Sequence, residues 1–244
     1  MYYSFTVNGL KSRAKVRRET VEKIFNPLLA ELTKRQKEKK KRLVVFLAAP
    51  PAVGKSTLAL LLEKLSRERD EFTEVQALGL DGFHFANAVL ASRYAEVGGR
   101  RVLLKDVKGC PETFDTDKFR EKLAALTRGD VRWPVYSRVT HDPAEDAEAV
   151  TGDIVLIEGN WLLLDEEPWR SFRKYADYAV FIRADETMLK ERLIRRKTRG
   201  GLTREEASAW YERSDGPNIR RALENSMNGD LNLALTPEGD FRVV

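Results

Sequence analysis

Short apolar stretches alternate along the chain with segments whose leucines follow helical spacing. Residues 43–49 mix β-branched and aromatic side chains without polar alternation, which predicts a buried strand. Later stretches at 74–80, 153–157 and 178–182 predict further strands. Because helical segments separate these strands, the pattern predicts an α/β fold whose parallel sheet carries helices on both faces.

Helical periodicity and helix-start signals mark the connecting segments. The predicted helices cover 57–65, 116–126, a segment from 186 onward, 203–211 and 219–227. Thr203 and Glu206 form a capping-box pattern at one of these helix starts. Residues 215–218 predict a turn before the last helix, and the chain is expected to end in a β-edge.

Residues 1–42 are predicted to be an N-terminal extension, mainly helical, of a domain that spans 43–244. Alternating apolar residues precede Asn8-Gly9, which allows a short strand or hairpin. Apolar residues from 21 to 32 then recur at helical spacing. Pro27 lies inside that pattern and either kinks the helix or begins a new one.

Two stretches outside the predicted helices are expected to be irregular or extended. Residues 92–117 are rich in glycine and charge, which predicts a long functional loop rather than core. Residues 131–139 are expected to be extended, with Pro134 arguing against a central strand. Residues 141–143 mark a turn.

The sequence APPAVGKS at 49–56 follows the first predicted strand of the core and precedes a helix. This order is typical of a phosphate-binding loop, because backbone N–H groups and the positive end of the helix dipole converge on one anion. Lys55 can reach the β- and γ-phosphates, and Ser56 can offer its hydroxyl to Mg²⁺. The loop residues expected to bind a nucleotide are Pro51, Ala52, Val53, Gly54, Lys55, Ser56 and Thr57.

The match to the pattern G-x-x-x-x-G-K-[ST] is incomplete. Ala49 stands at the first glycine of the pattern, and Ala52 stands where relatives often carry another. Alanine tolerates positive φ and close backbone approach less well than glycine does. A strand–turn–helix without a bound phosphate is the alternative interpretation.

Two carboxylates directly follow predicted strands. Asp81 and Glu158 would lie at the carboxyl ends of parallel strands, where open α/β sheets bind their ligands. Asp81 is a candidate general base for a substrate hydroxyl, or it only caps the next helix. Glu158 can hold Mg²⁺, directly or through water, or it has a structural role. His84 is better explained as a pocket wall or a satisfied polar residue than as a base.

An arginine stripe is predicted on the helix that begins at residue 186. Spacings of three, four and seven residues place its members on one face. They are Arg192, Arg195, Arg196 and Arg199. A lid over 186–212 that closes on phosphates, hinged at the glycine pair 200–201, explains the stripe. A solvated helix face is the alternative.

Composition and charge exclude several classes of protein. The 244 residues are 42% hydrophobic and 33% charged, and no apolar run reaches the roughly 18 residues of a membrane helix. Residues 1–15 do not resemble a signal peptide. The single cysteine, Cys110, excludes an internal disulfide framework and suits the cytoplasm. With two histidines and one cysteine, no zinc site is recognisable.

The positive charge of the chain is modest and locally concentrated. A net charge of +5 suits an anionic ligand such as ATP. Residues 34–42 are strongly basic, and a solvated helix end is favoured over a nucleic-acid arm because no aromatic residues are interleaved. Neither a nucleic-acid nor a membrane partner is therefore expected, while a homodimer is left open.

Seven stretches together resemble the P-loop small-molecule kinases typified by uridine kinase, bacterial pantothenate kinase and phosphoribulokinase. They are PPAVGKSTLA (50–59), DGFH (81–84), KGCPETFD (108–115), PVYSR (134–138), EGNWLLLDEEPW (158–169), ERLIRR (191–196) and DGPN (215–218). The nearest branch resembles the bacterial nucleoside/nucleotide kinases described as fructose-transport-system kinases. The resemblance covers roughly residues 43–230 and implies a P-loop NTPase fold, a three-layer α/β/α domain with an arginine-bearing lid.

The same resemblance implies transfer of the γ-phosphate of ATP, with Mg²⁺, to a hydroxyl of a small metabolite. It places Asp81 at the catalytic base, Lys55 and Ser56 at the phosphates and Mg²⁺, and Glu158 at the end of the acid-bearing strand. The implied lid residues are Arg192 and Arg196. The substrate-facing residues are Lys108, Tyr136, Arg138 and, as a pocket wall, His84.

The sequence thus predicts an ATP-dependent kinase acting on an alcohol. A P-loop ATPase or nucleotide-binding regulator without metabolite transfer is the alternative, because Ala49 and Ala52 replace glycines. Nucleosides, pantothenate-like alcohols and sugars all fit a pocket built from 83–115 and 134–141, so the acceptor is not determined.

Overall fold

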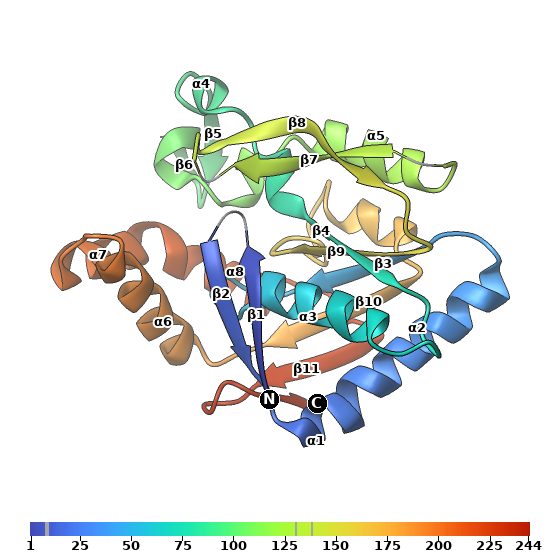
Figure 1. Cartoon of the computed structure of the whole chain (residues 1–244). Helices are drawn as coiled ribbons and strands as arrows, with labels where there is room; N and C mark the ends of the chain where they lie inside the picture. The colour runs from blue at the N-terminus through green and yellow to red at the C-terminus, as the bar shows by residue number, and fades with distance from the viewer. Residues whose placement is uncertain (8–9, 130, 138) are drawn as a thin grey trace.

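The computed structural model describes residues 1–7, 10–129, 131–137 and 139–244, and gives residues 6, 7 and 10–13 by their backbone alone. The predicted turn at Asn8-Gly9 and the predicted substrate residue Arg138 therefore lie outside the described residues. Figure 1 shows a central sheet with helices around it and two hairpins above it.

Among the described residues, six strands form the central sheet in the order β12-β11-β10-β3-β9-β4. Neighbouring strands are parallel except β11 and β12. The strands are β3 (Leu43–Ala48), β4 (Val75–Gly79), β9 (Ile154–Gly159), β10 (Tyr178–Arg183), β11 (Leu231–Leu235) and β12 (Phe241–Val243). The four strands expected from apolar runs and the β-edge at the chain end are confirmed, whereas β11 was not predicted.

The complete burial of two central strands, β3 and β9, explains why their sequences lack polar alternation. Every residue of β3 and of β9 is buried. Successive side chains point to opposite faces of a sheet, so a strand covered on both faces is apolar along most of its length. The charged residue of β9, Glu158, lies near the end of that strand. Val45 and Leu47 accordingly enter one hydrophobic cluster, while Val44 and Phe46 enter the other.

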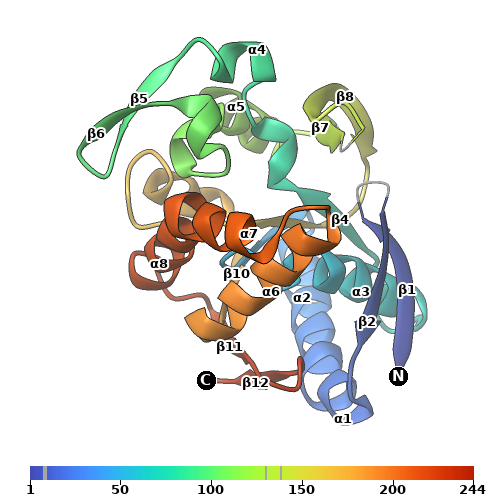
Figure 2. The same ribbon diagram turned by 90° about the vertical axis from the view of Figure 1, so that its left-hand side faces the viewer.

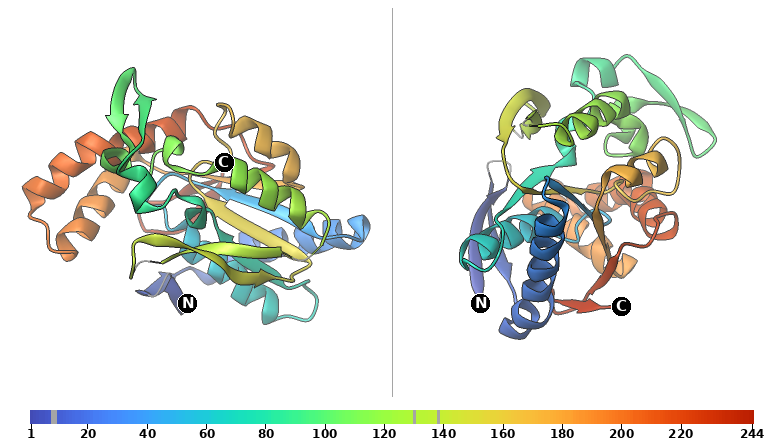
Figure 3. Two further views of the ribbon diagram at one scale, coloured as in Figure 1. Left: turned by 90° about the horizontal axis from the view of Figure 1, so that it is seen from above. Right: turned by 90° about the vertical axis from the view of Figure 1, so that its right-hand side faces the viewer.

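Helices cover both faces of the sheet and give the three-layer α/β/α arrangement (Figures 2 and 3). One face packs against α2 (Asn26–Lys39), α3 (Lys55–Arg67) and α6 (Glu186–Arg199). The other face packs against α5 (Thr116–Leu126) and the 3-10 turn η5 (Arg170–Tyr175). The prediction of a P-loop NTPase fold is confirmed.

The N-terminal segment contains a hairpin as well as a helix. Strands β1 (Tyr2–Val7) and β2 (Leu10–Lys15) pair antiparallel and lie beside α3. The short helix α1 (Arg18–Thr20), a π-helical turn and α2 follow without a break. Tyr3 and Phe25 belong to the same hydrophobic cluster as the buried residues of α3. The division of the chain at residue 42 stays a prediction.

Two prolines lie inside continuous helical segments, each just after a π-helical turn. Pro27 follows the turn η1 (Val21–Phe25), and Pro217 follows the turn η6 (Tyr211–Asp215). Each proline is then in the first turn of the next α-helix, a position at which proline is tolerated. The predicted turn at 215–218 is therefore wrong, because α8 (Gly216–Glu224) begins inside it.

The predicted long loop at 92–117 contains regular structure. Strands β5 (Tyr94–Val97) and β6 (Arg100–Leu103) form a hairpin, and the 3-10 turns η3 (Leu104–Val107) and η4 (Pro111–Thr113) follow. The hairpin residues are exposed or half-buried. Without a buried face, these strands have no apolar alternation that a sequence pattern could reveal.

A second hairpin stands beside the edge strand β4. It pairs β7 (Val131–Ser137) with β8 (Asp142–Val150), and Pro134 lies at a bulge between Trp133 and Val135. Pro134 is thus outside the central sheet, as predicted. Strand β8 was not predicted, because it is polar and mostly exposed.

The predicted lid region is helical. After α6 ends, Gly200 and Gly201 connect it to α7 (Arg204–Trp210), and Gly201 has a φ of 105°. The capping box of Thr203 and Glu206 is confirmed. In the part of the chain that the structure describes, no helix has the length and apolar character needed to span a bilayer.

Gly82 allows a close approach that positions the residue before it. It lies in the 3-10 turn η2 (Leu80–Phe83), and a Cβ there would be 2.0 Å from the carbonyl oxygen of Pro134. We expect Gly82→Ala to lower the free energy of unfolding by about 1–3 kcal/mol, because the backbone of β7 must shift. Urea denaturation measures this, with Gly129→Ala, whose Cβ meets nothing within 4 Å, as the control. Equal midpoints for the two variants would contradict the expectation.

Candidate functional site

The loop between β3 and α3 ends in a helix N-terminus with a glycine at its cap. Gly54 is the N-cap residue with a φ of 98°, and its carbonyl accepts the first helical bond, from the N–H of Leu58 at 3.0 Å. The N–H groups at the start of a helix have no partners within the helix, and the helix dipole makes this end positive. The loop can therefore bind an anion through its backbone.

The two alanines that replace glycines in the loop differ in their conformation. Ala49 is fully buried and donates its N–H to the carbonyl of Gly159 at 3.4 Å, without a positive φ. Ala52 has a φ of 66°. A left-handed conformation costs a non-glycine residue about 1–2 kcal/mol, so only Ala52 carries the strain that the missing glycines predict.

Asp81 and Glu158 lie close to this loop, Glu158 near the end of β9 and Asp81 just after the neighbouring strand β4. Glu158 is 8% exposed, opposite Gly79 in the β9–β4 pairing, and its Oε2 is 3.9 Å from the ammonium of Lys55. Asp81 follows β4 within the turn η2. Trp133 donates its indole N–H to the carbonyl of Gly79 at 2.9 Å and so anchors the end of β4 to β7.

A cavity of ≈ 190 Å³ lies between α3, the edge strand β4 and the β7–β8 hairpin. We call it the edge-strand cavity. Its lining residues are Ser56, Ala59, Leu60, Glu63, Ala77, Leu78, Gly79, Asp81, Gly82, Pro134, Val135, Tyr136, Glu148 and Glu158. The predicted residues Ser56, Asp81 and Glu158 thus share one cavity.

A second cavity, of ≈ 250 Å³, lies between the N-terminal segment, the phosphate loop, α3 and the C-terminal segment. We call it the N-terminal cavity. Its lining residues are Ala14, Lys15, Val16, Val53, Gly54, Thr57, Leu58, Leu61, Arg192, Leu235, Glu238, Gly239 and Phe241. Residues of the phosphate loop and of α3 thus line both cavities.

Arg192 of the arginine stripe on α6 contacts the phosphate loop. Arg192 places its guanidinium 3.4 Å from the carbonyl oxygen of Ala52 and 3.5 Å from that of Val53. Burial lowers the pKa of Arg192, and the charge of Arg195 lowers it further. Arg196 is exposed.

The other predicted substrate residues gather around one aromatic ring. The ring of His84 meets that of Tyr136 edge-on, with centroids 5.9 Å apart, and the ammonium of Lys108 lies 5.1 Å from the Tyr136 centroid. Lys108 also donates to Asn87 Oδ1 at 2.7 Å, a residue of α4 (Asn87–Leu90) that the sequence did not single out. The structure thus brings three of the four predicted substrate residues together, and Arg138 lies outside the described residues.

His84 is held in a packed environment. It stacks on Phe114 with ring centroids 3.9 Å apart, and its Nδ1 lies 3.2 Å from the hydroxyl of Thr113. Burial lowers the pKa of His84 below its usual 6.5, while the negative charge of Asp81 opposes this shift. The neutral imidazole is therefore the favoured form in the folded protein.

The oxygen donors beside the loop suit a hard divalent cation. Hydroxyl and carboxylate oxygens are the ligands that Mg²⁺ prefers, and Ser56 and Glu158 present them in the edge-strand cavity. Over the described ranges, no group of three or more His, Cys, Asp or Glu side chains could hold a metal by itself. Mg²⁺ bound here would be coordinated by these side chains together with phosphate oxygens, as in P-loop enzymes.

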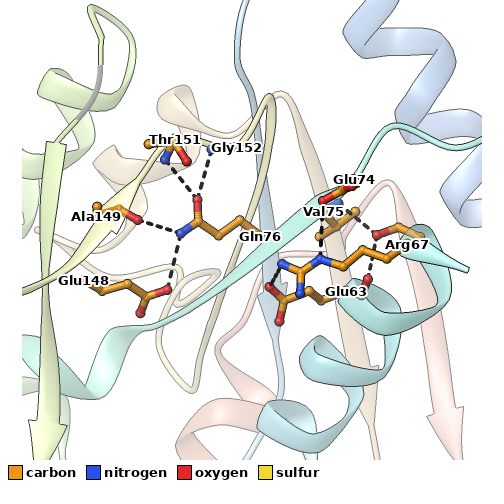
Figure 4. A network of polar contacts seen from close by, with 10 residues as sticks. Glu63, Arg67, Glu74, Val75, Gln76, Glu148, Ala149, Thr151 and Gly152 are labelled. Atoms are coloured by element: carbon orange, nitrogen blue, oxygen red, sulfur yellow. Dashed lines mark hydrogen bonds and ion pairs between the residues drawn. The ribbon is translucent and has the colours of Figure 1, made fainter.

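Sequence reasoning missed the polar contacts around Glu63 and Glu148, two residues that line the edge-strand cavity (Figure 4). Gln76 donates its side-chain amide to Glu148 Oε1 at 3.3 Å and to the carbonyl of Ala149 at 2.8 Å. Glu63, on α3, accepts from Arg67 at 2.7 Å. No local motif marks these residues, because strand pairing and helix packing bring them together.

Comparison with known proteins finds kinase relatives, although no family model matches the chain. The chain is 44% identical over 242 residues, 99% of its length and 98% of the relative's, to "Uncharacterized protein YggC" of Escherichia coli (strain K12). It is 30% identical over 208 residues, 82% of its length and 85% of the relative's, to "Putative uridine kinase C227.14" of Schizosaccharomyces pombe.

Two further similarities are informative. A pantothenate kinase of Listeria monocytogenes is 32% identical over 167 residues, and the match covers 66% of the chain and 52% of that enzyme. The crystal structure titled "putative fructose transport system kinase from Silicibacter sp. TM1040" has a TM-score of 0.73 and 28% identity, covering 84% of this chain and 98% of that one.

The lowered pKa of His84 makes stability depend on pH. Between that pKa and 6.5 the unfolded chain binds more protons than the folded one, so stability rises with pH and is lost as pH falls below 6.5. We expect His84→Asn to reduce the fall in melting temperature between pH 7.5 and pH 5.5. His141→Asn, at the exposed second histidine, is the control. Equal pH dependence in His84→Asn and wild type would contradict this.

Proposed function

Because the chain belongs to the family of P-loop kinases that includes uridine kinase and pantothenate kinase, we propose that it transfers the γ-phosphate of ATP to a hydroxyl of a small metabolite. The observation that supports this most strongly is that Ser56 of the phosphate loop and Asp81 line one cavity. Phosphoryl transfer needs a cradle for the triphosphate and a base for the alcohol side by side.

ATP would span the phosphate loop from one cavity to the other. The amides at the start of α3 and the ammonium of Lys55 bind the β- and γ-phosphates. Gly54 and Thr57 line the N-terminal cavity, so the nucleoside extends into it from the loop. Arg192 lines the same cavity and makes only long contacts to two loop carbonyls, which phosphate oxygens can replace.

Asp81 is the proposed general base. Its carboxylate accepts the proton of the acceptor hydroxyl as that oxygen bonds to the γ-phosphorus, and the bond from phosphorus to the β–γ bridging oxygen breaks to leave ADP. Lys55 stabilises the negative charge that develops on the phosphates. Gly82, which follows Asp81, lets η2 approach β7 closely, and so holds the carboxylate beside the loop.

Ser56 and Glu158 are the residues that would hold Mg²⁺, together with phosphate oxygens. Bound Mg²⁺ supplies charge neutralisation on the β- and γ-phosphates. Lys55 and Glu158, 3.9 Å apart, balance each other's charge in the protein without ligand. When the ligands bind, the phosphates would replace Glu158 as the partner of Lys55, and Mg²⁺ would replace Lys55 as the partner of Glu158.

The acceptor would lie in the edge-strand cavity against Tyr136, which lines it, whereas His84 and Lys108 contact the Tyr136 ring and are not among the lining residues. Closure of the lid over 186–212, hinged at Gly200 and Gly201, would bring Arg196 toward the transferred phosphate. A P-loop ATPase or regulator without an acceptor is the alternative, and the feature that favours it is that Ala49 and Ala52 stand where the loop pattern has glycines.

The role of Asp81 has a direct test. We expect Asp81→Asn to bind ATP normally and to lose at least about 100-fold in phosphoryl transfer, since a positioned base contributes roughly 10²–10⁴-fold. Release of ADP is measured against a panel of nucleosides, pantothenate and sugars. The control is Asp106→Asn, at an exposed aspartate of η3. Transfer by Asp81→Asn within twofold of wild type would remove Asp81 as the base. ADP release that is equal with and without every acceptor would favour the ATPase.

The backbone of the phosphate loop can be tested without changing any side-chain contact. An added Cβ at Gly54, φ 98°, would meet nothing within 4 Å, and the same holds for Gly98, φ 58°, in the β5–β6 hairpin. We expect Gly54→Ala to weaken binding of a non-hydrolysable ATP analogue at least tenfold by calorimetry, because the loop must leave its conformation. Gly98→Ala should bind as wild type does. Equal affinity in the two variants would argue against nucleotide binding by this loop.

A further inference from the structure

The edge-strand cavity has an unusual charge for a site beside bound phosphates. Four of its lining residues are carboxylates, namely Glu63, Asp81, Glu148 and Glu158, and no described lining residue is a lysine or arginine. Asp81 and Glu158 belong to the reacting end. Glu63 and Glu148 serve no step of the proposed reaction.

Glu63 and Glu148 form the end of the cavity that lies away from the phosphate loop. Glu63 lies two turns along α3 from Ser56, which is about 10 Å at 1.5 Å per residue. Glu148 faces the cavity from β8, across the edge strand β4. A small acceptor whose hydroxyl reaches Asp81 would therefore direct its other end toward these two carboxylates.

The network around Glu148 holds its carboxylate in place without neutralising it. Gln76 is fixed by the N–H groups of Thr151 and Gly152, at 3.1 and 3.0 Å, and offers Glu148 an uncharged amide donor. Among the described residues, no ion pair involves Glu148, whereas Glu63 pairs with Arg67 at 2.7 Å. The uncompensated negative charge of this end is thus that of Glu148.

The surroundings make both carboxylates costly as anions. Burial raises the pKa of Glu148. Burial also raises the pKa of Glu63; the charge of Arg67 opposes this shift, and the charge of Glu148 adds to it. A ligand that donates hydrogen bonds to Glu148 would offset this cost, whereas an anionic ligand would increase it.

We propose that Glu148, supported by Glu63, recognises the far end of the acceptor, and that the acceptor is a small alcohol bearing hydroxyl groups or an ammonium group there and no carboxylate or phosphate. The proposal rests on the proposed kinase function and narrows its substrate class. It separates this chain from pantothenate kinases, since pantothenate carries a carboxylate. Because Glu63 is paired with Arg67, this end of the cavity has too few oxygen ligands for a second metal ion.

The test compares three classes of acceptor with wild type and variants. The probes are uridine and glycerol as neutral polyols, 2-amino-1,3-propanediol as a cationic alcohol, and pantothenate and glycerate as anionic alcohols. ADP release gives kcat and KM for each. We expect wild type to turn over a neutral or cationic probe with at least tenfold higher kcat/KM than any anionic one. A preference for the neutral polyols would indicate recognition of hydroxyl groups, and a preference for 2-amino-1,3-propanediol would indicate recognition of an ammonium group.

Glu148→Gln should raise the KM of the best probe at least tenfold, with the KM of ATP unchanged. Glu145→Gln, at an exposed position of the same strand, is the matched control and should leave both KM values unchanged. A purely structural role of Glu148 would lower stability or kcat without this selective change in acceptor KM. An unchanged acceptor KM in Glu148→Gln, or a shift in its Mg²⁺ dependence instead, would overturn the proposal.

Failure of this proposal differs from failure of the proposed function. Preferred turnover of pantothenate or glycerate would overturn the proposal and leave the kinase intact. Constant ADP release with every probe, in a protein that binds a non-hydrolysable ATP analogue, would overturn both. A gain of anionic acceptors in Glu148→Lys, with loss of the neutral ones, would support the proposal independently of which probe is best.

Discussion

The site depends on the parallel pairing of β9 with both β3 and β4. In this register Glu158 is opposite Leu47 on one side and Gly79 on the other. Because parallel strands end at the same edge of the sheet, the phosphate loop after β3, Glu158 at the end of β9 and Asp81 after β4 meet there. Gly82 and Trp133 then fix Asp81 by holding the end of β4 against β7. Sheet register, rather than any single side chain, therefore assembles the chemistry.

Charge divides the two cavities that this edge supports. The N-terminal cavity includes the helix N-terminus and Arg192, both of which favour a polyanion. The lining of the edge-strand cavity includes four carboxylates, which would disfavour a second anion except where the γ-phosphate itself enters. Such a division would keep the phosphates on the loop side and admit a neutral or cationic alcohol on the other, so the same electrostatics would orient both ligands.

The sequence predicted those features that depend on local chemistry. Continuous apolar runs identified β3, β4, β9 and β10, and Thr203 with Glu206 identified a helix start. Strand β8 escaped prediction because it buries little, and the helix through Pro217 escaped because a π-helical turn makes room for the proline. In the site, the strand-end carboxylates Asp81 and Glu158 were predictable. Glu63 and Glu148 were not, because only tertiary packing brings them to the same cavity. The catalytic roles of Asp81 and Glu158 stay predictions.

In the proposed mechanism, the loop from Ala49 to Lys55 holds a triphosphate by its backbone and directs the terminal phosphate toward Asp81. A crystal structure with Mg²⁺ and a non-hydrolysable ATP analogue would test this. We expect the β-phosphate within hydrogen-bond distance of the backbone N–H groups at the start of α3, and the γ-phosphate facing Asp81 across the edge-strand cavity. A triphosphate bound away from these N–H groups, or a γ-phosphate turned away from Asp81, would contradict it.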